Sequence, residues 1–167
     1  PYMLKALEHD PTDIDILSNY GLLRASRGDL VQAEVLLRRA LHKATGFMQA
    51  WFNLGLVMRS QARLEATERA YLSALEAEGD NPEILLNYGA LLVEFHRFIE
   101  AEQCVRKVLS LRPDYINAHI GLGMLLKDQG RMQESLTALR RAIEIDPQEP
   151  SAHSSLLFVI NCIPDMD

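Results

Sequence analysis

Apolar residues along this chain recur with the spacing of amphipathic helices and not with the alternation of strands. Leu17, Tyr20 and Leu23 share one helical face. Turn signals with a central glycine, such as residues 27–29 and 129–131, separate successive helical stretches. The pattern predicts pairs of helices, called A and B here, near 13–26 and 29–43, 47–60 and 63–77, 81–94 and 97–110, and 115–128 and 131–145.

Four glycines mark the same place in each A helix. Gly21, Gly55, Gly89 and Gly123 are spaced by 34 residues. A glycine inside a helix costs about 1 kcal/mol relative to alanine, so its recurrence needs a reason. We expect the two helices of each hairpin to approach so closely there that a Cβ would hold them apart. Other positions keep the same period, including the large apolar residues Leu37, Tyr71, Val105 and Leu139.

This repeat resembles the tetratricopeptide repeat in its period and in the order of its small and large positions. The tryptophan typical of that family is Trp51, and its equivalents are Leu17, Leu85 and His119. The resemblance implies an all-α fold, a right-handed alpha-alpha superhelix or solenoid of helical hairpins. Residues 1–11 then form the end of a preceding B helix, residues 12–145 four repeats, and residues 146–167 a C-terminal capping helix and tail.

The composition of the chain excludes several classes of function. A net charge of −6 argues against a nucleic-acid-binding surface, and no apolar run reaches the roughly 18 residues that span a membrane. Cys104 and Cys162 lie among apolar neighbours and are expected to be small buried residues. We expect a cytoplasmic protein with no cofactor and no metal.

The sequence offers little for catalysis. It contains no glycine-rich phosphate loop and no nucleophile or metalloprotease motif, so the chain is expected to be non-enzymatic. His119 and His153 are 34 residues apart and could form a metal or acid–base pair. The alternative is that both histidines fill the tryptophan position of the repeat.

Binding is the remaining class. The resemblance implies that the A helices line a concave surface, where residues two before each glycine form a ladder of Asn19, Asn53, Asn87 and then Gly121. A primary amide suits the backbone of an extended peptide, although it could instead hydrogen-bond the next helix. The candidate peptide-binding residues are Asn19, Asn53, Asn87, Phe52, Leu86, Ile120, Leu56, Met124, Arg59 and Lys127.

The tail carries a second resemblance. Residues 152–167, AHSSLLFVINCIPDMD, are similar to the segment that joins the repeats to the catalytic domain in bacterial and plant relatives of O-linked N-acetylglucosamine transferase. This resemblance implies that the chain is the substrate- or partner-recognition arm of a larger glycosyltransferase-like protein. In that family the asparagine ladder holds the polypeptide substrate, which adds weight to the asparagines here.

Two hypotheses about the function therefore remain. The chain is an interaction module that takes a protein or peptide partner in a groove, as an arm of such an enzyme, or it is a free-standing scaffold for multiprotein assembly or self-association. Because the chain begins within a repeat, apolar surface near Ile14, Leu17 and Leu22 is expected to be exposed. Homo-oligomers could form through such solenoid ends.

Overall fold

The computed structural model describes residues 10 and 12–163. All regular elements in this part of the chain are α-helices. The eight helices between residues 13 and 145 have the predicted bounds to within one residue. They are α2 (Ile14–Ser26), α3 (Leu30–Lys43), α4 (Met48–Ser60), α5 (Leu64–Glu78), α6 (Pro82–Glu94), α7 (Phe98–Leu111), α8 (Ile116–Asp128), α9 (Met132–Ile145) and α10 (Pro150–Asn161). None of these helices is long and apolar enough to cross a membrane.

Side chains just before several helices fix where those helices begin. Asp13 accepts a hydrogen bond from the backbone N–H of Ile16 at 2.9 Å, and Asn81 accepts from Glu83 and Ile84 ahead of α6. Such caps satisfy backbone donors that have no partner inside the helix. Pro82 also favours a helix start at α6. Proline fits the first turn of a helix because its missing N–H is not needed there.

The turn inside each hairpin places one residue in the left-handed region. Gly28 and Gly130 have φ of 82° and 76°, and Ala62 and His96 occupy the same position of their repeats with φ of 57°. Glycine enters this region without steric cost, whereas an alanine or histidine is strained there. Two of the four hairpins therefore carry a strained residue at this turn.

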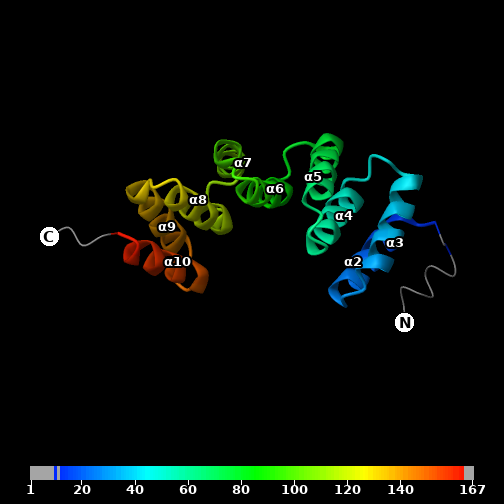
Figure 1. Cartoon of the computed structure of the whole chain (residues 1–167), viewed down its shortest axis with the longest axis horizontal. Helices are drawn as coiled ribbons and strands as arrows, with labels where there is room; N and C mark the ends of the chain where they lie inside the picture. The colour runs from blue at the N-terminus through cyan, green and yellow to red at the C-terminus, as the bar shows by residue number, and fades with distance from the viewer. Residues whose placement is uncertain (1–9, 11, 164–167) are drawn as a thin grey trace. The chain divides into compact units, whose positions relative to one another are not determined.

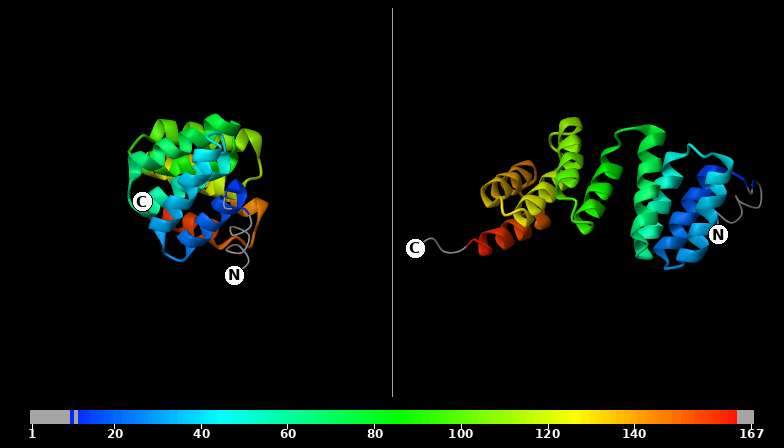
Figure 2. Two further views of the ribbon diagram at one scale, coloured as in Figure 1. Left: turned by 90° about the vertical axis from the view of Figure 1, so that its right-hand side faces the viewer. Right: turned by 45° about the horizontal axis from the view of Figure 1, so that its top comes forward.

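The described chain divides into two compact units, one ending at Gly79 and one beginning at Asp80. In the first unit α2 lies beside α3 and α4 beside α5, and α4 also packs on α2 and α3 (Figures 1 and 2). Its core contains Leu17, Leu37, Met58 and Tyr71, each no more than 1% exposed.

The second unit pairs α6 with α7 and α8 with α9, and α10 packs on α8 and α9 (Figure 2). Helix α10 buries Ala152 and Val159 against its neighbours. Three apolar side chains of the same helix stay exposed: Leu157 at 62%, Phe158 at 50% and Ile160 at 44%. The last helix thus covers the end of α9 while presenting an apolar face of its own.

The four glycines behave differently, which corrects the prediction of a uniform close approach. An ideal Cβ at Gly21 would lie 2.9 Å from Leu37 Cγ, and one at Gly123 would lie 2.5 Å from Leu139 Cγ. At Gly55 a Cβ would be equally crowded by the ring of Tyr71. At Gly89 the nearest atoms are 3.5 Å away, an ordinary contact distance. The clash that excludes a Cβ is confirmed in three hairpins and is absent from the α6–α7 hairpin.

Three further predictions can be compared with the structure. The preceding B helix predicted for residues 1–11 falls, apart from Asp10, outside the described residues, as does the tail beyond residue 163. Leu17 is 1% exposed because it belongs to the core of the first unit, so the prediction of its exposure is wrong, whereas Leu22 is 40% exposed. Cys104 is partly buried, but Cys162 is exposed at the end of α10, contrary to prediction.

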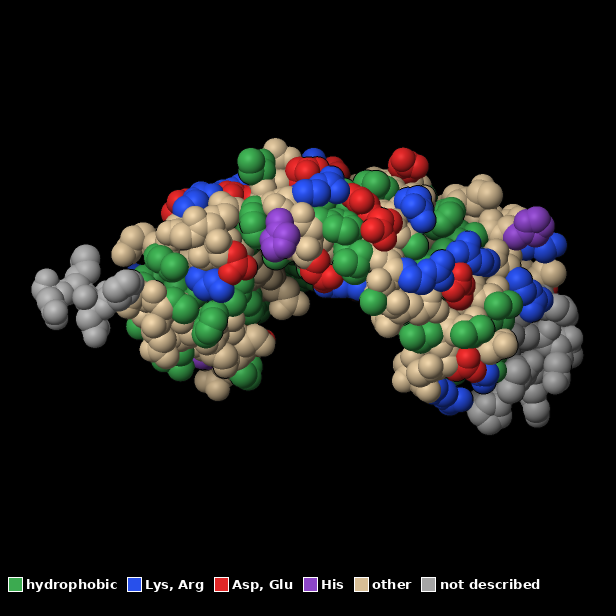
Figure 3. Space-filling view, in the orientation of Figure 1, with side chains coloured by type: hydrophobic (Ala, Val, Ile, Leu, Met, Phe, Trp, Pro, Cys, Tyr) green, Lys and Arg blue, Asp and Glu red, His purple; other side chains and the backbone are tan. Residues whose placement is uncertain are grey.

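Charged side chains on the surface pair with one another at repeating positions. On the face drawn in Figure 3, Lys and Arg side chains lie next to Asp and Glu side chains. Arg63 pairs with Glu34 at 2.9 Å, and Arg131 pairs with the equivalent Glu102 at 2.7 Å. Burial raises the pKa of Glu102, but hydrogen bonds from Arg106, Gln129 and Arg131 outweigh it and hold that pKa below its ordinary value.

Candidate functional site

The asparagine ladder has a structural role in the first unit. Asn53 is 1% exposed. Its Nδ2 donates to Ser18 Oγ at 3.0 Å, and its Oδ1 accepts from Gln49 Nε2 at 3.1 Å. This bridge joins α4 to α2 and closes the space between the two A helices. A partner would reach the Asn53 amide only if these hydrogen bonds were broken.

The other two ladder asparagines are more accessible. Asn19 is exposed on α2, and Asn87 is partly buried on α6. Asn87 Nδ2 donates to the backbone carbonyl of Glu83 at 2.9 Å within the same helix. This bond fixes the side chain and leaves Oδ1 free of the hydrogen bonds found among the described residues.

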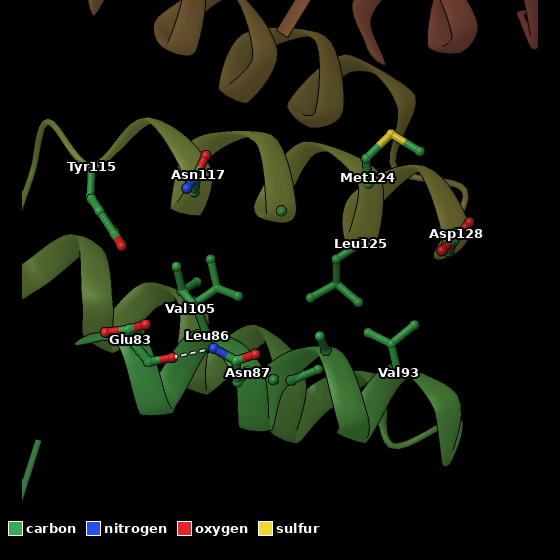
Figure 4. A pocket seen from close by; sticks show the side chains of 14 residues that line it. Glu83, Leu86, Asn87, Val93, Val105, Tyr115, Asn117, Met124, Leu125 and Asp128 are labelled. Atoms are coloured by element: carbon green, nitrogen blue, oxygen red, sulfur yellow. Dashed lines mark hydrogen bonds between the residues drawn. The ribbon is translucent and has the colours of Figure 1, made fainter. Parts of the chain in front are cut away.

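A cavity of about 510 Å³ lies in the second unit between α6 and α8, with α7 as its floor (Figure 4). We call it the α6/α8 groove. Its apolar walls include Leu86, Val93, Met124 and Leu125, and its polar groups belong to Glu83, Asn87, Tyr115, Asn117 and Asp128. Gly89, Ala90, Ala101, Val105 and Gly121 complete the lining.

The groove exists because the two residues that bridge the A helices of the first unit are replaced by residues that cannot form this bridge. Leu86 and Gly121 stand where the first unit has Ser18 and Asn53. Gly121 has no side chain to bridge the helices, and an ideal Cβ at this position would meet nothing within 4 Å. The amide bridge that closes the first unit is therefore missing between α6 and α8, and the space stays open.

The remaining predicted site residues divide between groove and core. Leu86 and Met124 line the groove. Phe52 is 5% exposed, and its ring lies 5.9 Å from that of Tyr71. Ile120 packs against the core formed by α9 and α10.

Three predicted side chains lie nearer the surface. Leu56 and Arg59 are partly buried on α4. Lys127 pairs with Asp128 at 2.6 Å, and its Nζ lies 4.9 Å from the centre of the Phe158 ring. The structure thus brings Leu86, Asn87 and Met124 together at one groove and places the other predicted residues elsewhere.

Sequence reasoning missed several groove residues, chiefly Glu83, Tyr115, Asn117 and Val105. A signal for Val105 was present, since the equivalent residues are Leu37, Tyr71 and Leu139. Only this repeat has a side chain small enough to leave space in front of its glycine. Asn117 and Tyr115 carried no such signal, because they lie outside the ladder positions.

The two histidines fill the tryptophan position. Trp51 Nε1 donates to the carbonyl of Thr45 at 2.7 Å. His119 Nε2 bonds the carbonyl of Pro113 at 2.7 Å, and His153 Nε2 bonds that of Pro147 at 2.9 Å. A carbonyl only accepts, so each histidine donates its Nε2 proton. Among the described residues, no group of three or more His, Cys, Asp or Glu is placed to hold a metal ion.

Comparison with known proteins identifies the repeat. Residues 96–157 and residues 2–35 each match a model of the tetratricopeptide repeat. The chain is 32% identical over 78 residues to Tetratricopeptide repeat protein 7A of Homo sapiens, covering 47% of this chain and 9% of that protein. It is 33% identical over 89 residues to the type IV pilus assembly protein PilF of Pseudomonas aeruginosa, covering 53% of this chain and 35% of PilF. The matches thus span far less than two thirds of either relative.

Solved structures agree on the fold. The chain matches YrrB, described as a TPR protein with an unusual peptide-binding site, with a TM-score of 0.78 and 21% identity, over 97% of this chain and 84% of that one. It matches the structure of Pseudomonas aeruginosa PilF with a TM-score of 0.81 and 23% identity, over 89% and 68%. The chain therefore carries tetratricopeptide repeats, and the predicted class, an all-α superhelix of such hairpins, is confirmed.

Proposed function

We propose that this chain of tetratricopeptide repeats is a protein–protein interaction module that binds an extended segment of a partner polypeptide in the α6/α8 groove. The observation that carries the proposal is the presence of a glycine, Gly121, in the middle of α8. A glycine in the middle of α8 costs about 1 kcal/mol of helix stability, yet no neighbouring atom requires it. Its effect in the structure is to leave the groove open.

The groove has the chemistry that peptide binding needs. Asn87 Oδ1 can accept a hydrogen bond from a peptide N–H, and the exposed amide of Asn117 offers both donors and an acceptor. Leu86, Val105 and Leu125 line the groove between α6 and α8 and can cover apolar side chains (Figure 4). An apolar cavity with a few placed polar groups is the usual form of a binding site. The peptide-binding site named for YrrB, which shares the fold, also supports this proposal.

A selection experiment tests the proposal without a known partner. A phage-displayed library of random dodecapeptides is selected on the full chain, and fluorescence anisotropy then measures the affinity of a selected peptide. Asn87→Ala is expected to weaken that affinity by about 2- to 12-fold, the value of one net hydrogen bond. Gly121→Leu is expected to abolish binding, because its side chain projects into the groove.

The matched control is Asn161→Ala, since Asn161 is an exposed asparagine at the end of α10. Its affinity should equal that of the unmodified chain. If Gly121→Leu folds and binds the selected peptide with unchanged affinity, the α6/α8 groove is not the binding site. Weakening by Asn19→Ala instead would move the site to the first unit.

The tail motivates a finer proposal, that the parent protein is glycosyltransferase-like and uses this chain to recognise its polypeptide substrate. The support is the sequence of residues 152–167 and its similarity to the repeat-to-catalytic-domain junction of that group. The coding sequence downstream of Asp167 tests whether the parent protein is glycosyltransferase-like. A nucleotide-sugar-binding domain there would support the proposal, and a stop codon or an unrelated domain would end it.

The alternative, a scaffold that self-associates, is favoured by one observation. Leu157, Phe158 and Ile160 form an exposed apolar face on α10, and large exposed apolar patches are typical of interaction sites. Sedimentation should then show a concentration-dependent dimer that the substitution Leu157→Ser dissociates. A monomer at millimolar concentration would refute self-association through this face.

A further inference from the structure

We infer that Ala90 and Gly121 form an anchor subsite in the α6/α8 groove, which takes one large apolar side chain from a peptide that carries a lysine or arginine about three residues away. This inference rests on the proposed function and specifies which peptides the groove prefers. Ala90 belongs to α6 and Gly121 to α8, and both line the groove. We call the part of the groove that these two residues line the notch.

The notch is open because each of the two helices carries a small residue there. An ideal Cβ at Gly121 would meet no atom within 4 Å, and Ala90 is exposed. Larger residues stand at the equivalent positions of α2 and α4, which are Leu22 and Asn53. Asn53 is 1% exposed, so its side chain fills the corresponding space in the first unit. The second unit lacks both side chains and leaves room for a side chain from outside.

The walls next to the notch are apolar. Ala90 precedes Val93 by three residues and Gly121 precedes Leu125 by four, so each small residue shares a helix face with its apolar neighbour. Figure 4 shows Val93 pointing from α6 and Leu125 from α8 into the groove between these helices. Leu86 lines the groove one turn before Ala90. A side chain that enters the notch therefore contacts apolar groups from both helices.

The size and chemistry of the groove favour a large apolar side chain in the notch. The groove has a volume of about 510 Å³, within the range of about 300–1,000 Å³ that is typical of ligand sites. An apolar side chain that enters gains the free energy of leaving water, whereas a charged one would lose part of its hydration without a partner. The notch therefore selects Phe or Leu over Ala or Asp.

Charge selects a second residue of the peptide. Glu83 lies at one end of the groove, beside the start of α6 (Figure 4). None of the ion pairs among the described residues involves its carboxylate. Asp128 lies at the opposite end, where Lys127 pairs with it. Residues 80–167 carry thirteen Asp and Glu against eight Lys and Arg, so the surrounding field also favours a cationic peptide.

The helix geometry sets the spacing between anchor and cation. Glu83 precedes Ala90 by seven residues, which corresponds to about 10 Å along a helix. An extended peptide covers about that distance in three residues. The preferred occupant is therefore an extended peptide with a Phe or Leu anchor and a Lys or Arg three residues away.

Labelled nonapeptides with the core Lys-Gly-Gly-X-Gly-Gly-Lys, where X is Phe, Leu, Ala or Asp, test the anchor on the full chain. A lysine on each side of X lets the peptide bind in either direction. Titrations are followed by NMR shifts of the Asn87 and Asn117 side-chain amides and of the Val93 and Leu125 methyls. The Phe and Leu peptides are expected to bind about tenfold or more tightly than the Ala peptide, and the Asp peptide most weakly.

Two variants fill the notch, one from each helix. Ala90→Leu introduces the residue that α2 has at this position, and Gly121→Asn introduces the residue that α4 has. Each should lower the affinity of the Phe peptide to that of the Ala peptide. Because Ala90 is exposed and no atom lies near a Cβ at Gly121, both variants are expected to fold, and circular dichroism checks this. Ala77→Leu is the control, because it makes the same change at an exposed position of α5.

The charge preference has its own arm. Replacing both lysines of the Phe peptide with glutamine should lower its affinity, and Glu83→Gln should remove that difference between the two peptides. Glu78→Gln, a change at an exposed residue of α5, should leave the difference intact. A lysine preference that survives Glu83→Gln would overturn the assignment of Glu83.

The outcomes separate the anchor from the proposed function. If no peptide moves the Asn87 and Asn117 signals, peptide binding in the groove fails altogether. If all peptides move these signals with equal affinity and Ala90→Leu changes nothing, the groove binds peptides but the anchor subsite is refuted. If the Val93 and Leu125 methyls shift only with protein concentration, the occupant is a second copy of the chain, and the inference is overturned.

Discussion

Adding a single methyl group at two equivalent glycines should change stability in opposite directions. Gly89 and Gly123 occupy the same place in the repeat and lie in the same unit. Gly89→Ala is expected to stabilise the chain, whereas Gly123→Ala is expected to destabilise it. The difference arises entirely from the side chain that faces each glycine.

The magnitudes follow from the distances. At Gly89 the new Cβ meets nothing closer than 3.5 Å, so only the helix preference of alanine operates, a gain of about 0.5–1 kcal/mol. At Gly123 the Cβ would lie 2.5 Å from Cγ and 2.9 Å from Cδ2 of Leu139, which is fully buried and cannot move into solvent. Forcing such an overlap costs about 1–3 kcal/mol, which outweighs the helix gain.

Thermal unfolding followed by circular dichroism at 222 nm measures both changes. A change of 1 kcal/mol shifts the melting temperature by about 2–4 °C in a protein of this size. Gly121→Ala calibrates the helix gain alone, because no atom lies near that position. The reasoning fails if Gly89→Ala destabilises the chain as much as Gly123→Ala does, or if Gly123→Ala raises the melting temperature.

Three further changes test other parts of the fold. Ala62→Gly should raise the free energy of unfolding by up to about 1 kcal/mol, because it relieves a left-handed residue; a drop in urea midpoint would contradict the strain at this turn. Trp51→Phe should lower the free energy of unfolding by about 0.5–1.5 kcal/mol or more through loss of the indole hydrogen bond, and an unchanged midpoint would show that this bond contributes nothing. The pKa of Glu102 is lower in the folded chain than its ordinary 4.5, so its stabilising effect is full above that pH and is lost as pH falls below it. Glu102→Gln should therefore reduce the loss of stability between neutral and acidic pH, and parallel pH profiles of the two proteins would refute the assignment.

The helices could be predicted closely because their determinants are local. Caps such as Asp13 and Asn81, the proline at Pro82 and the glycine turns all act within a few residues, and the 34-residue period repeats them. Each repeat thus supplied an independent estimate of the same boundaries. The close approach at Gly21, Gly55 and Gly123 followed in the same way from the recurrence of glycine.

The site could be predicted only in part because its determinants are not local. Asn53 and Asn87 are the same residue at the same position, yet one is buried in a bridge to Ser18 and the other lines a groove. What separates them is the neighbouring A helix. Ser18, 35 residues before Asn53, accepts its amide proton, whereas Gly121, 34 residues after Asn87, has no side chain to bridge the helices. The repeat period predicts each position by itself. It therefore indicates Asn87 and Met124 but not the combination of Gly121 and Val105 that opens the space.

The bonds made by His119 and His153 have a consequence for the loops that precede their helices. Each ring donates through Nε2 to a backbone carbonyl six residues earlier in the chain. Trp51 donates through Nε1 to the carbonyl of Thr45, which is also six residues earlier. At this position the repeat therefore uses imidazole for the same donation that indole makes. A ring with an N–H at this position ties the loop before its A helix to that helix.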